Sequence, residues 1–461
     1  MRILNKEIIG KENEAVELMG WVATRRDHGK LIFIDLRDRS GISQVVFLPK
    51  PEELCQLADK LRSEWVIKII GTVSRRPKGM ENPEIETGNF EIRAEKLEIL
   101  NPAETPPLAV DTDGYEIGED VRLKYRYLDL RRPRLQKNLK MRAKIIKFIR
   151  DFLTEKDFVE IETPILSKST PEGARDYLVP SRLQPGKFYA LPQSPQQYKQ
   201  LLMVACFERY FQIAKCFRDE DTRGDRQPEH TQIDIEISFT TPEKVMSLVE
   251  EMVIKMIKSI YPTKKMEVPW PRISHKEAME KYGTDKPDLR KNKDDPNEIA
   301  FVWVVDFPQF ELDKNTKEIQ PVHHMFVQPK EDSIVLIDSE PLKMISTQYD
   351  WVCNGYELAS GSIRITNPEL QMKVFKLLGM SEEKAKKDFG HLLEAFSFGA
   401  PPHGGIAPGI DRLVMILQNE PNIREVIAFP KTGDGRDLMM DAPSEVDEEQ
   451  LKELNIKTTD N

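Results

Sequence analysis

Short apolar runs separated by turn signals dominate the first hundred residues. Five of them are rich in β-branched and aromatic side chains: Val16–Val22, Leu31–Leu36, Ile42–Phe47, Trp65–Val73 and Phe90–Leu100. Between the third and fourth, Pro51–Ser63 carries leucines three and four residues apart, which is typical of one helix face. Five strands with a helix after the third predict a small closed barrel of the OB type.

The pattern changes after a proline-containing linker, Asn101–Asp111, and a basic run, Arg122–Arg134. A long helix is predicted from Met141, Ile145, Phe148 and Phe152. Further on, the sequence predicts strands Tyr210–Phe217, Thr231–Phe239, Phe301–Phe307 and Ile406–Gly409, and a helix Pro242–Tyr261. The strands are too irregularly spaced for repeated βαβ units, so the prediction is an α+β fold: an N-terminal OB barrel followed by a domain on an antiparallel sheet. The expected parts are 1–104 (barrel), 105–135 (hinge), 136–440 (α+β domain) and 441–461 (C-terminal extension).

Composition narrows the class of protein. Of 461 residues, 31% are charged and 39% hydrophobic, and the net charge of −9 argues against a basic nucleic-acid coat protein. The four cysteines form no CxxC pair, which argues against a disulfide framework and favours a reducing cytoplasm. We expect no targeting segment and no membrane span. Neither GxxxxGK[ST] nor GxGxxG after a strand occurs, so a nucleotide would have to be held in another way.

Three segments are candidates for chemistry. FRDEDTRGDRQPEH (Phe217–His230) lies between two predicted strands and would form a hairpin that holds charged groups over a cleft. GGIAPGIDRLVMIL (Gly404–Leu417) places Arg412 near a helix start, where anionic groups are favoured. TPILSKSTPEGARDYLVPSR (Thr163–Arg182) follows the long helix, with Pro164 in an extended strand. Each alone is weak, because charged loops and Gly–Asp–Arg turns are common.

Together these segments resemble the three motifs of class II aminoacyl-tRNA synthetases. With QSPQQYKQLLM, VHHMF, NGYEL…GSIR and APPHGG…GIDR, the chain resembles bacterial-type aspartyl-tRNA synthetases from about Val16 to its end. The resemblance implies that L-aspartate attacks the α-phosphate of ATP, and that aspartyl-adenylate then gives its aspartyl group to tRNA. ATP and Mg²⁺ are the implied cofactors. Such chemistry needs positioning and charge neutralisation more than a nucleophile.

The resemblance also assigns roles to individual residues. Arg218 and Arg412 would be catalytic. Aspartate would be held by Glu172, Ser194, Gln196, Lys199, Arg218, Asp234, His323 and Arg364. ATP would be held by Arg218, Asp219, Glu220, Gln227, His230, Glu357, Gly409, Ile410, Asp411 and Arg412. Asp350 and Glu357 would carry Mg²⁺, which prefers carboxylate and phosphate oxygens. Lys199 and Arg364 would select aspartate, because asparagine would leave both cations buried and uncompensated.

On the barrel, Arg26, Phe33, Gln44 and Glu91 match the anticodon-reading positions of the family. An aromatic ring beside basic groups suits stacking on bases, although Phe33 in LIFIDL could equally be a core residue. His28 and Gly79 match members that accept both tRNA(Asp) and tRNA(Asn), although turn residues of these types are common. The implied activity is aspartate ligation to both tRNAs. The product Asp-tRNA(Asn) would then require an amidotransferase.

Three departures from the family stand out. The large inserted domain of bacterial members is absent, because only a short charged connector joins Arg290 to Phe301. His230 stands where a phenylalanine usually stacks on adenine, so we expect weaker or pH-sensitive ATP binding. Ala359-Ser360 replaces two glycines near Arg364.

Alternatives remain at this point. They are a ligase restricted to tRNA(Asp), an RNA-binding paralogue that has lost ligation, and an asparaginyl or lysyl relative. The resemblance further implies a homodimer formed through the long helix and the Pro164 strand.

Overall fold

The chain folds into two compact units, Met1–Arg132 and Pro133–Asn461, in the computed structural model. The structure describes residues 1–171 and 173–458, so Glu172, one of the predicted aspartate ligands, lies outside the described residues. Within the described ranges, no helix is both long and apolar enough to cross a membrane.

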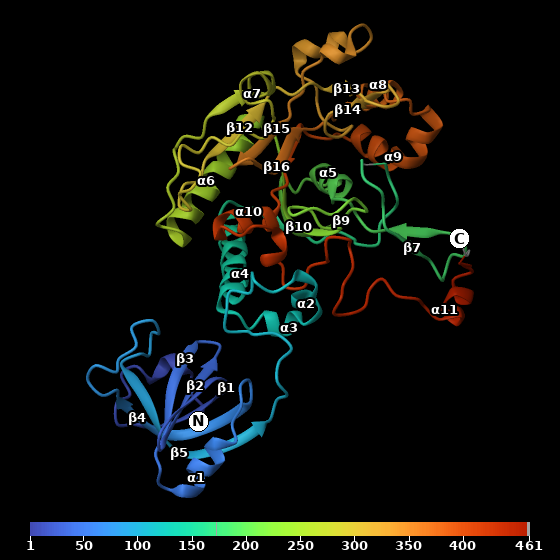
Figure 1. Cartoon of the computed structure of the whole chain (residues 1–461). Helices are drawn as coiled ribbons and strands as arrows, with labels where there is room; N and C mark the ends of the chain where they lie inside the picture. The colour runs from blue at the N-terminus through green and yellow to red at the C-terminus, as the bar shows by residue number, and fades with distance from the viewer. Residues whose placement is uncertain (172, 459–461) are drawn as a thin grey trace. The chain divides into compact units, whose positions relative to one another are not determined.

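The first unit contains the predicted five-stranded barrel (Figure 1). Its strands are β1 (Ala15–His28), β2 (Leu31–Asp38), β3 (Gly41–Phe47), β4 (Val66–Arg75) and β5 (Phe90–Asn101). They close in the order β1-β2-β3-β5-β4, with β3 and β5 parallel and the other pairs antiparallel. Helix α1 (Glu52–Asp59) follows the third strand as expected but ends before Ser63.

Strand alternation decides which side chains fill the barrel. Ile32, Ile34 and Leu36 of β2 are buried in its core, whereas Phe33 and Asp35 between them are only partly buried. Successive side chains of a strand point to opposite faces. Phe33 is therefore on the outer face, and the reading of Phe33 as a core residue is wrong.

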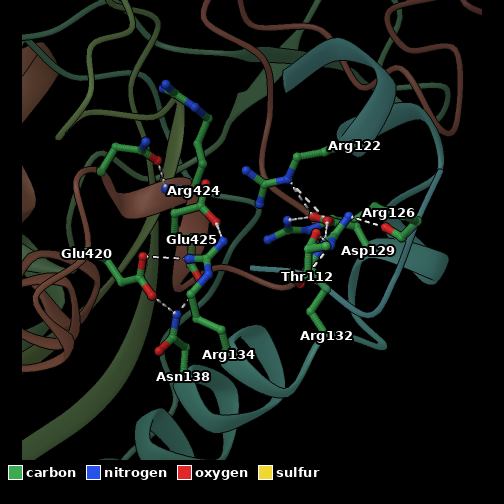
Figure 2. Close-up of polar contacts among 12 residues, drawn as sticks. Thr112, Arg122, Arg126, Asp129, Arg132, Arg134, Asn138, Glu420, Arg424 and Glu425 are labelled. Carbon is green, nitrogen blue, oxygen red and sulfur yellow. Dashed lines mark hydrogen bonds and ion pairs between the residues drawn. The ribbon is translucent and has the colours of Figure 1, made fainter. Parts of the chain in front are cut away.

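The basic run ends the first unit as two short helices, α2 (Glu119–Lys124) and α3 (Arg126–Asp129). The fully buried Asp129 accepts hydrogen bonds from Arg122 Nε (3.1 Å), Arg126 Nη1 (2.6 Å) and Arg132 Nε (2.6 Å), as Figure 2 shows. Although burial opposes ionisation, the arginines hold the pKa of Asp129 below its usual value. These three arginines therefore hold the segment together around one carboxylate.

The second unit is built on an eight-stranded sheet in the order β11-β12-β15-β16-β17-β10-β9-β6. In that order the strands span Arg272–Ser274, Phe301–Val305, Tyr349–Cys353, Tyr356–Ile363, His403–Ile406, Glu229–Ser238, Arg209–Phe217 and Val159–Glu160. The sheet is antiparallel, as predicted, except at its two edge pairs. Helices α4 (Pro133–Thr154), α6 (Pro242–Ile260) and α10 (Ile410–Gln418) share its main apolar core (Figure 1).

Smaller elements complete the second unit: α5 (Gln196–Val204), α7 (His275–Tyr282), α8 (Pro368–Leu377), α9 (Glu382–Ser397), α11 (Glu448–Glu453) and the hairpins β7–β8 (Leu178–Pro180, Phe188–Ala190) and β13–β14 (Phe310–Leu312, Ile319–Pro321). Arg134 fixes the start of α4, because it forms ion pairs with Glu420 (2.6 Å) and Glu425 (2.9 Å) (Figure 2).

Two strand predictions are wrong. The predicted strand Ile406–Gly409 is instead His403–Ile406, because Pro408 has no N–H for a strand ladder and Gly409 already caps α10. Pro164 lies outside any strand, since β6 ends at Glu160.

Candidate active site

A cavity of about 400 Å³ opens in the second unit, a size typical of small-molecule sites. It brings together residues that are far apart in the sequence. The predicted residues among its lining are Ser194, Gln196, Lys199, Arg218, Glu220, Gln227, His230, Asp234, His323, Glu357, Arg364, Gly409, Asp411 and Arg412.

One end of the cavity holds a buried cluster of two cations and two acids. Lys199, on α5, places Nζ 2.7 Å from Asp234 Oδ1 and 3.3 Å from Glu236 Oε2. Arg364, directly after β16, donates two hydrogen bonds to the Glu236 carboxylate, from Nε (3.0 Å) and from Nη2 (3.1 Å). Asp234 and Glu236 are two residues apart on β10, so they share one face of the strand.

The contacts in this cluster change the expectation that, without aspartate, Lys199 and Arg364 would be buried and uncompensated. Glu236, which the sequence did not single out, already compensates Arg364, so the cations would not stand unpaired without aspartate. Against the cost of burial, Arg364 and Lys199 lower the pKa of Glu236 to about 2, whereas burial raises the pKa of Asp234. Selectivity for a carboxylate therefore depends on the charge of Asp234 as well as on the two cations.

Polar groups suited to an amino acid's ammonium and carboxylate lie beside this cluster. Ser194 Oγ accepts a 3.4 Å hydrogen bond from the backbone N–H of Gln196, at the start of α5. Gln232 also lines the cavity, and its buried Nε2 has no hydrogen-bond partner among the described residues. Gln232 was missed, although the polar alternation Gln232–Asp234–Glu236 within an apolar strand was a signal for it.

The two histidines of VHHMF follow strand β14 and lie outside the strands that the structure describes, with ring centroids 4.5 Å apart. His324 Nε2 is 3.1 Å from Arg364 Nη1. His323 is accessible from the cavity, yet desolvation by the surrounding protein and the nearby Arg364 lower its pKa to about 4 despite the opposing Glu357. Both rings can thus act as neutral hydrogen-bonding groups near pH 7.

The other end of the cavity is lined by arginines and acids from the predicted hairpin between β9 and β10. Arg218 follows β9 directly, and among the described residues its guanidinium has no hydrogen-bond or ion-pair partner. Arg226 pairs with Glu220 at 2.8 Å. Gln227 Oε1 accepts from the backbone N–H of Lys431 (2.7 Å). An unpaired cation beside this network is suited to bind an anion.

Helix α10 positions Arg412 as predicted from its sequence. Arg412 donates to the backbone oxygen of Glu357 (2.8 Å) and pairs with Asp225 (3.1 Å). The Asp411 carboxylate also lies at the cavity, but it already accepts from Arg142 on α4 (2.5 Å) and from the backbone N–H of Thr231 (3.0 Å). Asp411 therefore supports the site.

Two predicted ATP residues do not line the cavity. Ile410 is fully buried in the main core, and Asp219 is exposed on the hairpin. Their neighbours in the motif carry the side chains that reach the cavity. Contact between ATP and these two residues therefore stays a prediction.

The predicted metal pair lies on two adjacent strands, β15 and β16. Asp350 is buried behind Ser360, from which it accepts a 2.5 Å hydrogen bond, and Gln348 donates to it at 3.1 Å. Burial, followed by the neighbouring Glu357 carboxylate, raises the pKa of Asp350 above its usual value. Two mutually repelling carboxylates fit a divalent cation, which would relieve that repulsion.

Within residues 1–171 and 173–458, no group of three or more histidine, cysteine, aspartate or glutamate side chains is arranged to hold a metal. Mg²⁺ is commonly bound by one or two carboxylates together with substrate phosphates, so the donor set fits this ion. Lys286, which the sequence did not single out, contacts Glu357 with Nζ at 2.9 Å from Oε2.

His230, the unusual residue at the adenine position, lines the cavity at the start of β10. Burial, followed by the cations Arg218 and Arg412, lowers its pKa to about 4 even though Asp411 opposes this. The ring is therefore neutral near pH 7. Any pH sensitivity that it confers on ATP binding is expected near pH 4.

The outer face of the barrel gathers the predicted anticodon residues. Asp35, Gln44 and Glu91 are in register across β2, β3 and β5, and Gln44 Nε2 donates to Glu91 at 3.1 Å. Arg26 is opposite Phe33 in the ladder and forms a two-point ion pair with Asp35 (2.5 and 2.8 Å). Single-stranded nucleic acid is bound by aromatic rings beside basic groups, and Phe33 and Arg26 provide one of each on this face.

His28 lies near this face and Gly79 lies in a turn. These are the two residues that match family members accepting both tRNA(Asp) and tRNA(Asn). The His28 ring contacts Phe33 edge-on, with centroids 5.6 Å apart. Gly79 has φ of +85°, which L side chains rarely adopt, and a Cβ added there would meet no atom within 4 Å. A side chain at position 79 would thus be disfavoured by the backbone and not by a clash.

Comparisons with known proteins agree with this geometry. Residues 118–433 match the family described as tRNA synthetases class II (D, K and N), and residues 16–100 match the OB-fold nucleic acid binding domain. A relative named aspartate–tRNA(Asp/Asn) ligase from Rubrobacter xylanophilus is 45% identical, over 96% of this chain and 94% of the relative. A relative of the same name from Dehalococcoides mccartyi is 43% identical, over 98% of both chains.

The first alignment extends over 566 residues although this chain has 461, so more than a hundred positions of the relative have no counterpart here. This agrees with a missing internal domain. Among solved structures, asparaginyl-tRNA synthetase from Pyrococcus horikoshii aligns with a TM-score of 0.76 at 22% identity, covering 94% of this chain and 98% of that one. An aspartyl-tRNA synthetase from Entamoeba histolytica aligns with 0.73 at 22% identity, covering 93% and 91%. At such identities the likeness concerns the fold alone.

Proposed function

The chain belongs to the class II tRNA synthetases of the D, K and N group, and on that premise we propose that it ligates L-aspartate to tRNA through aspartyl-adenylate, acting on both tRNA(Asp) and tRNA(Asn). The observation that carries the proposal is the cavity with a buried Lys199–Asp234–Glu236–Arg364 cluster at one end. Arg218 lies at the other end, and its guanidinium has no partner in the part of the chain that the structure describes.

The residues divide the chemistry between them. Lys199 and Arg364, with Asp234 and His323 beside them, receive the side-chain carboxylate of aspartate, while Ser194, Gln196 and Glu172 hold its ammonium. Arg218 brings the reacting carboxylate and the α-phosphate of ATP together. The carboxylate oxygen bonds to the α-phosphorus, and the bond to the β-phosphate breaks with its electron pair leaving on pyrophosphate. Because two anions must meet, fixed cations lower the barrier by charge neutralisation.

The remaining ATP contacts follow from the same assignment. His230 stacks on adenine, Glu220 and Gln227 flank the nucleotide, and Arg412 holds the terminal phosphate, with Gly409 at the start of its helix. Asp350 and Glu357 would hold Mg²⁺, which when bound supplies further charge neutralisation at the phosphates. In the transfer step a terminal ribose hydroxyl of the tRNA attacks the aspartyl carbonyl carbon. The bond from that carbon to the phosphate oxygen breaks, AMP leaves with the electron pair, and the hydroxyl proton is released to solvent.

Action on both tRNAs is supported by the names of the relatives and by the barrel face. Arg26, Phe33, Gln44 and Glu91 would read the anticodon, and Glu91 can accept a hydrogen bond from the cytosine amine. His28 beside Phe33 and the glycine at position 79 would relax the choice between the two anticodons. An amidotransferase would then act on Asp-tRNA(Asn). The barrel, 1–104, is the proposed anticodon-binding domain and 136–440 the proposed catalytic domain, joined by 105–135 and followed by 441–461.

We further propose a cytoplasmic homodimer. Its proposed contact region is the long helix α4 and the segment after it. There Val159, Ile165 and Leu166 are 45%, 49% and 53% exposed in the single chain. Covering such apolar side chains on association is favourable. Sedimentation equilibrium of the purified protein, with Ile165→Glu as the disrupting variant, tests this assembly.

The proposed activity is tested by ATP–pyrophosphate exchange with each candidate amino acid. We expect exchange with aspartate and, at equal concentrations, at least a hundredfold less with asparagine or lysine. No exchange with any amino acid would favour a non-ligating RNA-binding protein. Exchange with asparagine or lysine alone would show that the protein is an asparaginyl or lysyl relative instead.

A further inference from the structure

Lys286 is a cation of the cavity that has no role in the proposed function so far. It lies on the segment between α7 and β12, lines the cavity, and places Nζ 2.9 Å from Glu357 Oε2. Among the described residues it is the one side-chain cation ion-paired with either acid of the proposed metal pair. The cavity arginines Arg226 and Arg412 pair instead with Glu220 and Asp225.

The segment that carries Lys286 is fixed to the same strand turn that carries Glu357. Asp288 packs against Gly355, since a Cβ on Gly355 would lie 3.6 Å from Asp288 Cβ. Further along, Ala300 and Asn354 exchange two hydrogen bonds, from Ala300 N to Asn354 Oδ1 (2.9 Å) and from Asn354 N to Ala300 O (3.2 Å). The lysine and its acid are therefore held on parts of the fold that are attached to each other.

The short connector that replaces the family's inserted domain closes on itself. The carboxylate of Glu298 accepts from the backbone N–H groups of Lys291 (2.7 Å) and Asn292 (2.9 Å), and Asp288 pairs with Arg290 at 2.8 Å. Such local bonds fix the loop without help from another domain. The connector thus positions Lys286 although the chain lacks the insertion.

We propose that Lys286 is a further catalytic residue of adenylate formation: it neutralises Glu357 in the free protein and moves its positive charge to the pyrophosphate leaving group when ATP and Mg²⁺ bind. This inference rests on the proposed function. A divalent ion on the Glu357 carboxylate would repel the Lys286 ammonium, and the lysine stem is flexible enough to turn toward the phosphates. The charge that Lys286 stabilises develops on the oxygen between the α- and β-phosphorus as that bond breaks. No proton transfer is needed.

The test compares Lys286→Met and Lys286→Arg with the wild-type protein and with Lys281→Met, an exposed control on α7 that pairs with Glu277. Three quantities are measured on the full chain. They are aspartate-dependent ATP–pyrophosphate exchange, single-turnover transfer to tRNA from isolated enzyme-bound aspartyl-adenylate, and Mn²⁺ binding without ATP by electron paramagnetic resonance.

We expect Lys286→Met to lower exchange kcat/KM for ATP by roughly a hundredfold, as loss of one charge-stabilising group does elsewhere. Transfer should stay within about twofold of wild type, because pyrophosphate has already left. Mn²⁺ should bind several-fold more tightly, since the competing ammonium is gone. Lys286→Arg should restore most of the exchange, and Lys281→Met should match wild type in all three.

Other results would overturn the inference. Exchange by Lys286→Met within about twofold of wild type, an equal fall in transfer, or Mn²⁺ affinity that is unchanged or weaker would each contradict the role of Lys286 alone. A wild-type protein without aspartate-dependent exchange would instead overturn the proposed function, and this inference with it.

Discussion

At the scale of single residues, selection of aspartate depends on cations buried within a network of charges. Lys199 is 2% exposed and shares its charge between Asp234 and Glu236. At ~4 Å and an effective dielectric near 20, one ion pair is worth about 4 kcal/mol. Because Glu236 already takes part of the positive charge, the gain from an incoming carboxylate is smaller than for a bare cation.

Lys199→Met is therefore expected to lower kcat/KM for aspartate by roughly a hundredfold to a thousandfold, with the KM for ATP changed less than about threefold. Steady-state exchange at varied aspartate and varied ATP measures both. The exposed Lys258→Met on α6 is the matched control. An equal loss toward both substrates would mean that Lys199 supports the fold of the whole cavity and not the aspartate site.

The histidines of the cavity give a second prediction at this scale. The folded pKa of His230 is lowered to about 4, below the usual value near 6.5, so between these values only the unfolded chain gains the proton. Stability is then fully present above about pH 6.5 and is lost as pH falls toward 4. His230→Phe should reduce the drop in the free energy of unfolding between pH 7 and pH 5 by at most about 2 kcal/mol. Urea unfolding at both pH values measures it, and an unchanged drop would contradict the buried neutral ring.

Two of the residues that sequence reasoning missed, Glu236 and Lys286, form ion pairs that no local pattern reveals. Arg364 and Glu236 are 128 positions apart, and Lys286 meets Glu357 across a sheet turn, so neither pairing leaves a spacing signal. Phe33 is different, because strand alternation places it on the outer face next to the core residues Ile32 and Ile34. Alternation alone could have chosen between its two readings.

At the scale of elements, apolar periodicity located the barrel strands and the hairpin β9–β10 but was less reliable at their ends. β1 extends to His28, six residues beyond the predicted end, because its polar second half pairs with β2 without an apolar signal. Gly409 was assigned to a strand although it caps a helix. Termini depend on hydrogen bonds to distant segments, and such bonds are not encoded in local composition.

Helix α10 offers a test of how one element holds another. Asp411 joins α10 to α4 through Arg142 and to β10 through Thr231 N, and removing one partner of a buried pair typically costs 3–5 kcal/mol. We expect Asp411→Ala to lower the free energy of unfolding by about 3 kcal/mol and to raise the KM for ATP. Asp338→Ala, which removes an exposed acid outside the cavity, should change the first quantity by at most about 1 kcal/mol and leave the second unchanged. A stable Asp411→Ala protein with a raised KM would instead make Asp411 a direct ATP ligand.

At the scale of the whole molecule, sequence motifs identified the family, the barrel and most residues of the cavity. They could not provide the charge balance inside the cavity, since that requires the positions of Glu236, Gln232 and Lys286. The missing insertion was visible in the sequence, whereas the closed connector around Glu298 that takes its place was not. Family motifs thus located the site, whereas residues that the motifs did not single out determine the charge balance inside the cavity.

The most direct measurement of the central claim is aminoacylation of purified tRNA(Asp) and tRNA(Asn) transcripts side by side, with aspartate as the amino acid. The account predicts that both accept aspartate with kcat/KM values within about tenfold of each other, and that His28 and Gly79 variants widen this gap. A preference of about a thousandfold for tRNA(Asp), equivalent to ~4 kcal/mol, would contradict action on both tRNAs, and no aspartate on either would contradict the ligase itself.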